Sequence, residues 1–120
     1  MMLLCNLFIA CVFVHVGTVL ALDDQALCSI LNSTTSGITS WSCLNDVPTT
    51  DICTWNGVTC NGNGGVVSLN LKRKNISGHL DDALGDISLL TYLNIQQNSL
   101  SGSIPTTLNK LTKLQYLNLN

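Results

Sequence analysis

The second half of the chain repeats itself with a period of 24 residues. The segment that begins at Leu69 is followed by a similar segment from Leu93, and the same pattern opens a third time at Leu117. A period in the twenties indicates stacked coils, each of which buries its apolar face against its neighbours. We therefore predict a solenoid whose function lies on an exposed surface rather than in a catalytic pocket. The other recurring positions are Leu71/Ile95/Leu119, Ile76/Leu100, Ser77/Ser101, Gly78/Gly102, Leu80/Ile104, Leu84/Leu108, Ile87/Leu111 and Leu90/Leu114.

The amino-terminal segment is almost wholly apolar from Leu3 to Leu20, and the first charged residue is Asp23. Val19-Leu20-Ala21 offers small or short side chains where a signal peptidase would cut. We expect a signal peptide over residues 1–21 and a mature chain that starts near Leu22. The alternative is an uncleaved membrane anchor, because about 18 apolar residues are the lower edge of a spanning length.

The remaining residues suit one domain, and their charge excludes nucleic acid as a partner. The formal net charge is −2, and the basic residues form only two groups, Lys72-Arg73-Lys74 and Lys110 with Lys113. Three adjacent cations are too few for affinity through phosphate neutralisation. They are better explained as a solvated strand end.

Six cysteines constrain the first half of the chain. Cys5 and Cys11 would leave with the signal peptide, and an even number in a secreted chain indicates two disulfides. Three connectivities remain open, and we favour the two nearest pairings. A zinc site is not expected, because the mature chain has one histidine, His79, and no C-x-x-C spacing. The favoured pairs are Cys28–Cys43 and Cys53–Cys60.

Residues 22–65 read as a cap on the solenoid. An Asp at position 23 or 24 would cap a short helix whose apolar face carries Leu27, Ile30 and Leu31. Trp41 and Trp55 could stack on a ligand, but each lies two residues from a cysteine, which favours packing inside the cap.

Residues 66–120 hold two full 24-residue units and the start of a third. Val67, Leu69 and Leu71 alternate inward on a short strand, and the amide of Asn98 turns inward to satisfy backbone groups. Pro105 leads into a helical or 3₁₀ turn. The remaining inward side chains are Leu100, Ile104, Leu108, Leu111 and Leu114.

Two motifs resemble a known family. The run L-x-x-L-x-L-x-x-N-x-L-S-G-x-I-P-x-x-L, over residues 90–108, resembles the plant-specific class of leucine-rich repeat. The pattern C-x-W-x-G-V-x-C, over residues 53–60, resembles the amino-terminal cap of extracellular plant leucine-rich-repeat proteins. The resemblance implies an α/β leucine-rich-repeat solenoid with short parallel strands on the concave face and a disulfide-bonded cap. Family members are receptor-like kinases, receptor-like proteins and secreted inhibitors, and they bind peptides, steroids, co-receptors or microbial enzymes through the concave side.

The chain departs from the family pattern at three places. Lys74 occupies the Asn98 column in the first unit, and we expect it to extend its ammonium group outward. Asp81 replaces the proline of the Pro105 column, so the first turn should be less firmly set. Cys28 and Cys43 are additional to the cysteine pair of the C-x-W-x-G-V-x-C pattern.

Side chains that flank the inward leucines should face solvent on the concave side and could bind a partner. The competing interpretation is an ordinary polar surface. Three strands span only about 10 Å, whereas a stable interface needs about 800 Å² from each partner. We therefore expect a protein or peptide ligand, or a co-receptor, to need further repeats, with any membrane attachment carried by a later part of a longer protein. The candidates are Ser68, Asn70, Lys72, Arg73, Tyr92, Asn94, Gln96, Gln97, Tyr116, Asn118 and Asn120.

Asn32-Ser33-Thr34 and Asn75-Ile76-Ser77 are N-glycosylation sequons. Asn75 has a structural alternative, because a one-residue bulge would let it take the inward position vacated by Lys74.

The leading hypothesis is a non-enzymatic recognition module at the start of a receptor-like ectodomain. It would be secreted, or held at the outer face of the plasma membrane or in the cell wall, and the isolated chain should associate with itself. The alternative is a secreted inhibitor of microbial wall-degrading enzymes. Catalysis, a cofactor and a metal are not expected, because no carboxylate has an acid–base partner at a convincing spacing and His79 suits a solvated turn. The carboxylates considered are Asp46, Asp51, Asp81, Asp82 and Asp86.

Overall fold

The computed structural model describes residues 3–4, 12–13, 18–35 and 37–120. The expected signal peptide, with Cys5 and Cys11, therefore lies largely outside the described residues. Its described parts include β1 (Leu3–Leu4) and β2 (Val12–Phe13), which pair antiparallel. Among the helices of the described residues, none is long and apolar enough to cross a membrane.

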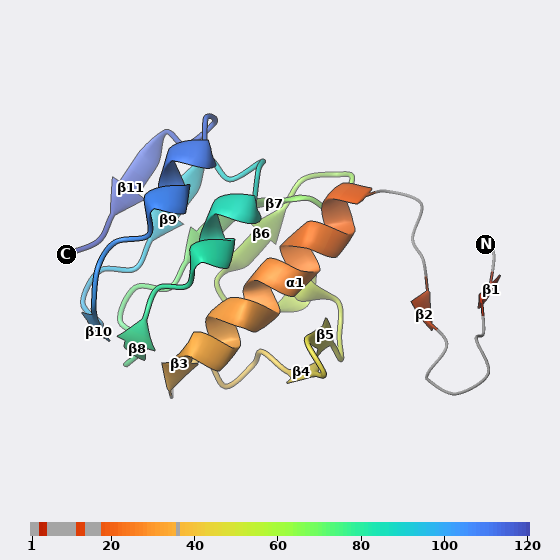
Figure 1. The fold of residues 1–120 in the computed structure, drawn as a ribbon, viewed down its shortest axis with the longest axis horizontal. Coiled ribbons are helices and arrows are strands. Elements are labelled where there is room, and N and C mark those ends of the chain that lie inside the picture. The colour runs from red at the N-terminus through yellow and green to blue at the C-terminus, as the bar shows by residue number, and fades with distance from the viewer. Residues whose placement is uncertain (1–2, 5–11, 14–17, 36) are drawn as a thin grey trace.

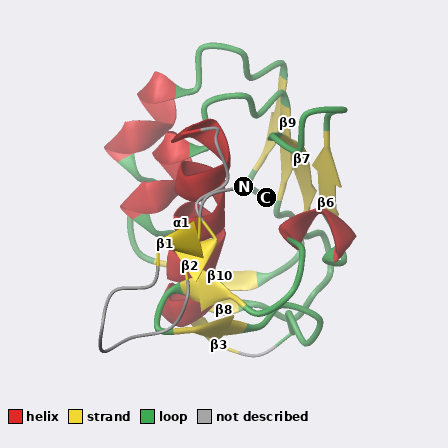
Figure 2. Cartoon of the chain, turned by 90° about the vertical axis from the view of Figure 1, so that its right-hand side faces the viewer, coloured by secondary structure: helices red, strands yellow, loops and turns green. Residues whose placement is uncertain are grey.

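The chain forms two layers, with a sheet on one side and helical elements on the other (Figures 1 and 2). The helical layer holds α1 (Thr18–Ser33), η2 (Asp82–Asp86) and η3 (Thr106–Lys110). Buried apolar side chains, among them Leu27, fill the space between the layers. The sheet has the order β11-β9-β7-β6, with β6 Val58–Cys60, β7 Val66–Asn70, β9 Tyr92–Asn94 and β11 Tyr116–Asn118.

The 24-residue period sets the register of the sheet. β7, β9 and β11 are parallel, and Leu69 pairs with Leu93, which pairs with Leu117. Leu69 and Leu93 are buried, as the alternation predicted. β6 belongs to the cap and pairs antiparallel with β7, across an irregularity after Thr59. The prediction that Val67 points inward was wrong: Val66 is fully buried and Val67 only half-buried, at the point where the register between β6 and β7 shifts. The cap and the repeats therefore share one sheet.

A second sheet, which the sequence did not predict, joins α1 to the first repeat. It has the order β10-β8-β3, with β3 Thr34–Thr35, β8 Ser77–His79 and β10 Ser99–Ser101. Thr34-Thr35 directly follow α1 and pair antiparallel with β8. Gly78 allows this pairing, because its φ is +102° and a Cβ there would lie 2.4 Å from the carbonyl oxygen of Ser33.

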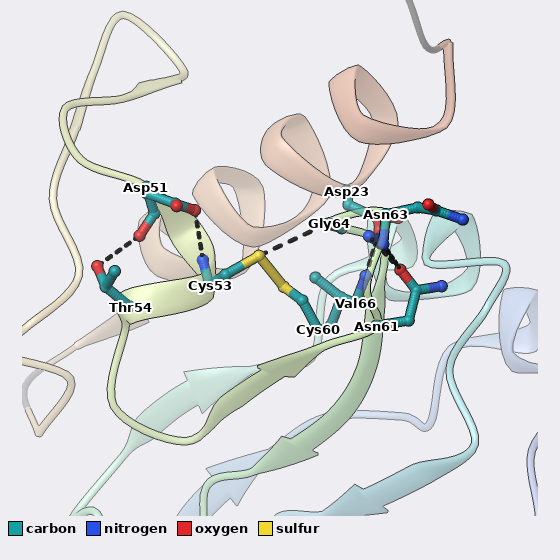
Figure 3. The surroundings of a disulfide bond; sticks show 10 residues. Asp23, Asp51, Cys53, Thr54, Cys60, Asn61, Asn63, Gly64 and Val66 are labelled. Carbon is teal, nitrogen blue, oxygen red and sulfur yellow. Dashed lines mark hydrogen bonds between the residues drawn. A yellow bond between two sulfur atoms is a disulfide. The ribbon is translucent and has the colours of Figure 1, made fainter.

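Two disulfides and two tryptophans hold the cap together. Cys28 is joined to Cys43 and Cys53 to Cys60, the pairing favoured from the sequence (Figure 3 shows the second bond). Trp41 and Trp55 stack with their ring centroids 5.0 Å apart, and both are buried, so they pack the cap and present no face to a ligand. The hairpin of β4 (Cys43–Leu44) and β5 (Val47–Pro48), and η1 (Ile52–Thr54), complete it.

The predictions for Asp23 and Ile104 were wrong. The first helix begins at Thr18, so Asp23 is not its N-cap but a buried residue inside it. Ile104 was expected to point inward but is 59 % exposed, whereas Leu80, its equivalent one coil earlier, is half-buried against the core. The reason is local: the described chain places no further coil over Ile104.

The 3₁₀ turns form as the repeats require, and Asp81 compensates for the missing proline. In the second coil Pro105 precedes η3, as predicted. In the first coil the Asp81 side chain accepts a hydrogen bond from Ala83 N at 2.8 Å and so caps η2. The first turn is therefore capped by a side chain where the second is started by a proline.

Candidate recognition surface

The face of the β11-β9-β7 sheet that is turned away from the helical layer is called the outer face here. It brings most of the candidate residues into aligned columns. Strand pairing places Ser68, Tyr92 and Tyr116 side by side, and it does the same for the asparagine column two residues further on. Backbone hydrogen bonds continue this alignment past the strands, from Leu71 N to Asn94 O and from Arg73 N to Gln96 O. The face therefore has a tyrosine end, at the column of Tyr92 and Tyr116, and a basic end after β7, at Lys72 and Arg73.

The two tyrosines form a stacked pair. Their ring centroids are 4.4 Å apart and their planes differ by 6°. Tyr116 is 41 % exposed and Tyr92 is half-buried. Each hydroxyl accepts a hydrogen bond from the amide two residues along its strand, from Asn94 at 3.2 Å and from Asn118 at 3.3 Å. The recurring Tyr-Leu-Asn sequence was the signal for this coupling, which sequence reasoning missed.

The asparagine column is not uniformly open to solvent. Asn70 is exposed and Asn118 is half-buried, but Asn94 is only 4 % exposed, so the expectation that it faces solvent was wrong. Asn94 lies on the middle strand of the three, donates to the Tyr92 hydroxyl and accepts from Gln96 N at 3.2 Å. Its amide therefore holds the neighbouring side chains in place and leaves little of itself for a ligand.

At the basic end, Lys72 and Arg73 form no ion pair with any carboxylate of the described residues. The ion pair found in the described part of the chain joins Lys110 to Asp86, in the helical layer. Arg73 donates from Nε to the Gln97 side chain, and both residues have positive φ, of 55° and 58°. Gln97 and Arg73 are exposed and Lys72 is half-buried. A ligand that reaches this end meets positive charge and amide groups.

Asn98 supports the surface from inside the coil, as predicted. Its Nδ2 donates to the carbonyls of Leu71 and Ile95, at 2.8 and 2.7 Å. Its Oδ1 accepts from the backbone N–H groups of Lys74 and Ile76. The Lys74 side chain extends outward to Asn56 Oδ1 at 3.1 Å, as expected. The backbone of the first coil is therefore held by Asn98 of the second coil.

Most of the carboxylates considered for catalysis make contacts within the fold. Asp46 accepts from Asn32, Asp51 accepts from Cys53 N, and Asp86 pairs with Lys110 at 3.5 Å. His79 is exposed. In the described part of the chain no group of three or more His, Cys, Asp or Glu residues is placed to hold a metal ion. An open depression of about 360 Å³ along α1 is lined by Gln25, Ser29 and Asp86 among others, far from the sheet face.

Both sequon asparagines are exposed. Asn32 lies near the end of α1 and donates from Nδ2 to Asp46 Oδ1 at 2.8 Å. Asn75 is exposed and has φ 53°, so it does not fill the buried inward position that the structural alternative required. The structural alternative for Asn75 is therefore wrong.

The cap matches a family model. Residues 20–61 match the model described as "Leucine rich repeat N-terminal domain". This range covers α1 from its third residue, both tryptophans and all four cysteines of the cap.

Curated relatives and solved structures extend the likeness into the repeats. A probable inactive leucine-rich repeat receptor-like protein kinase of Arabidopsis thaliana is 37 % identical over 79 residues, 61 % of this chain and 11 % of that protein. Phytosulfokine receptor 1 of the same plant is 40 % identical over 52 residues, 42 % of this chain and 5 % of the receptor. The chain thus spans about a tenth or less of the length of these relatives.

Among solved structures, the Arabidopsis thaliana BIR2 ectodomain aligns with TM-score 0.70 and 34 % identity, over 81 % of this chain and 53 % of that one. The ectodomain of the Arabidopsis thaliana receptor kinase GASSHO1/SCHENGEN3 aligns with TM-score 0.65 and 31 % identity, over 80 % and 12 %. Residues 20–61 thus match a leucine-rich-repeat amino-terminal domain, and the cap with its 24-residue repeats is similar in sequence and fold to the leucine-rich-repeat ectodomains of plant receptor kinases.

Proposed function

We propose that the chain begins the extracellular recognition domain of a receptor-like protein, and that the outer face of its sheet contacts a peptide or protein partner. The observation that carries this proposal is the aligned face itself, with a stacked tyrosine pair at one end and, at the other, Lys72 and Arg73, for which the described residues show no ion pair. Aromatic side chains supply large contact area at a low entropic cost, and they are enriched in interfaces.

The named relatives favour a receptor over a secreted enzyme inhibitor. Those reported above are receptor-like kinases or receptors, and the GASSHO1/SCHENGEN3 ectodomain was solved in complex with CASPARIAN STRIP INTEGRITY FACTOR 2. A solved structure of PEPR1 with AtPEP1 aligns at 30 % identity and TM-score 0.65, over 78 % of this chain and 14 % of that one. We infer by analogy that this chain, too, binds a peptide or protein partner.

The size of the face limits what the chain does alone. Three strands span about 10 Å, so a partner would share its contacts between this face and further repeats. We propose that the chain is extracellular, that it contributes binding and no catalysis, and that Asn32 and Asn75 accept N-glycans. Exposure of both asparagines supports the last point.

A displayed library of random dodecapeptides tests the proposed surface. Peptides are selected on the secreted chain and then measured against two matched double variants. Tyr92→Ala/Tyr116→Ala removes the stacked pair, and Thr106→Ala/Asn109→Ala alters two exposed residues of η3 in the opposite layer. We expect the first variant to lose most binding and the second to keep it. Peptides that bind all three proteins equally would contradict the proposal.

A further inference from the structure

Asp23 is a buried carboxylate with one oxygen left unsatisfied. Its exposure is 0 %, and its Oδ2 accepts a hydrogen bond from Val66 N at 2.8 Å (Figure 3 shows the two residues together). Its Oδ1 is also buried and has no hydrogen-bond partner within the part of the chain that the structure describes. Burying a carboxylate is costly unless a cation or further donors compensate for the lost hydration. Oδ1 therefore needs a donor that the intact helix does not provide.

The side chains around Asp23 do not supply a positive charge. Every Lys and Arg of the chain lies between Lys72 and Lys113, and residues 22–65 contain four aspartates and no Lys or Arg. Asp24 adds a repulsive negative charge, while α1 packs against η2, which bears Asp82 and Asp86, and near the hairpin that bears Asp46. Burial raises the pKa of Asp23, the Val66 N–H opposes that rise, and Asp24 adds to it.

The predicted processing site lies directly before this carboxylate. Cleavage after Val19-Leu20-Ala21 would make Leu22 the first residue and give it a free α-ammonium group. We propose that this α-ammonium group of Leu22 is the missing partner of Asp23 Oδ1, so that removal of residues 1–21 completes the contact between cap and repeats.

Distance and freedom of movement permit the pair. Neighbouring Cα atoms are about 3.8 Å apart, and the Leu22 side chain is 50 % exposed, so a terminal Leu22 has room to turn its nitrogen toward Asp23. In the unprocessed chain the same nitrogen is an uncharged amide inside α1. Cleavage changes it into a cation with three donors, which is the group that Oδ1 requires.

The pair would connect the new amino terminus to the first repeat through one side chain. Asp23 Oδ2 already binds the backbone of Val66, the first residue of β7. With Oδ1 bound to the α-ammonium group, both oxygens of the carboxylate that joins α1 to the sheet have partners. The unprocessed precursor has the bond from Asp23 Oδ2 to Val66 but leaves Oδ1 without a partner, so its cap should hold less firmly to the repeats.

The test measures the pKa of the α-amino group in the secreted chain, produced with its own leader. Amino-terminal sequencing should give Leu22 as the first residue. The pH dependence of the Leu22 ¹³Cα chemical shift should then give an α-amino pKa above the ordinary value of about 7.7–8.0, because the carboxylate favours the charged form. Asp23→Asn should return the pKa to the ordinary range, and the neighbouring control Asp24→Asn should leave it raised.

Stability gives a second readout with a defined sign. A raised α-amino pKa contributes stability that is complete below about pH 7.7 and is lost as the pH rises through the folded pKa. The melting temperature of the native chain should therefore fall more between pH 7 and pH 10 than that of a variant with one Ser inserted before Leu22. This variant keeps Asp23 and is available even if Asp23→Asn does not fold. A first residue other than Leu22 would overturn the proposal. An ordinary α-amino pKa in the native chain would also overturn it, because that is the result expected if a water or a proton, and not the terminus, satisfies Oδ1.

Discussion

At the scale of single residues, the role of an asparagine side chain could be predicted inside a turn of the coil but not on a strand. The role of Asn98 could be predicted, because a turn inside a coil leaves backbone donors and acceptors that one carboxamide can satisfy together. The burial of Asn94 could not, because it depends on a tyrosine hydroxyl and on Gln96, which the strand brings close. The buried state of Asp23 was missed for the same reason, since its partner is Val66, 43 residues away.

Asn98→Ala should lower the free energy of unfolding by about 3 kcal/mol, because it leaves two backbone N–H groups and two carbonyls of the coil without their partner. Urea unfolding followed by circular dichroism measures the change. The control Asn109→Ala alters an exposed asparagine of η3 and should stay within about 0.5 kcal/mol of the native chain. Equal effects of the two substitutions would show that Asn98 does not hold the coil.

At the scale of elements, the repeats were predictable and the joints between cap and repeats were not. The strands and 3₁₀ turns of the coils follow from a pattern that occurs twice, so each copy supports the other. β3 follows from no such pattern, because Thr34-Thr35 pairs with β8 only after α1 has docked. The only sequence feature that points to β3 is Gly78. It has a positive φ, and its lack of a Cβ leaves room for the backbone of Ser33.

Two equivalent glycines test this joint. Gly78 and Gly102 occupy the same column and have φ of +102° and +82°, so alanine is strained at both. A Cβ at Gly78 would lie 2.4 Å from Ser33 O, whereas at Gly102 the nearest atom is His79 Cβ at 3.6 Å. Gly78→Ala should therefore destabilise the chain by about 1–3 kcal/mol more than Gly102→Ala in urea unfolding. Equal losses would mean that β3 contributes no close contact.

At the scale of the whole molecule, the cap and the repeats form one folding unit because they share both sheets and the core between the layers. β6 of the cap pairs with β7, β3 pairs with β8, and α1 packs along η2. The overall architecture could be predicted, since a fixed period permits few folds. The extent of contact between cap and repeats could not, because it depends on side chains far apart in the sequence.

The aromatic residues report on the two parts separately. Both tryptophans lie in the cap and both tyrosines lie in the repeats. Because neighbouring units of a solenoid stabilise one another, tryptophan fluorescence and tyrosine near-ultraviolet circular dichroism should give the same urea midpoint. Two separate midpoints would show that the cap folds without the repeats.

The central claim is that the outer face of the sheet is the recognition surface. Its most direct test is an NMR titration of the ¹⁵N-labelled secreted chain with a peptide selected from the dodecapeptide library. We predict that amide shifts concentrate at Tyr92, Gln96, Tyr116 and Asn118, with smaller changes at Lys72. Shifts confined to α1, η2 and η3, with the strands unchanged, would contradict the account.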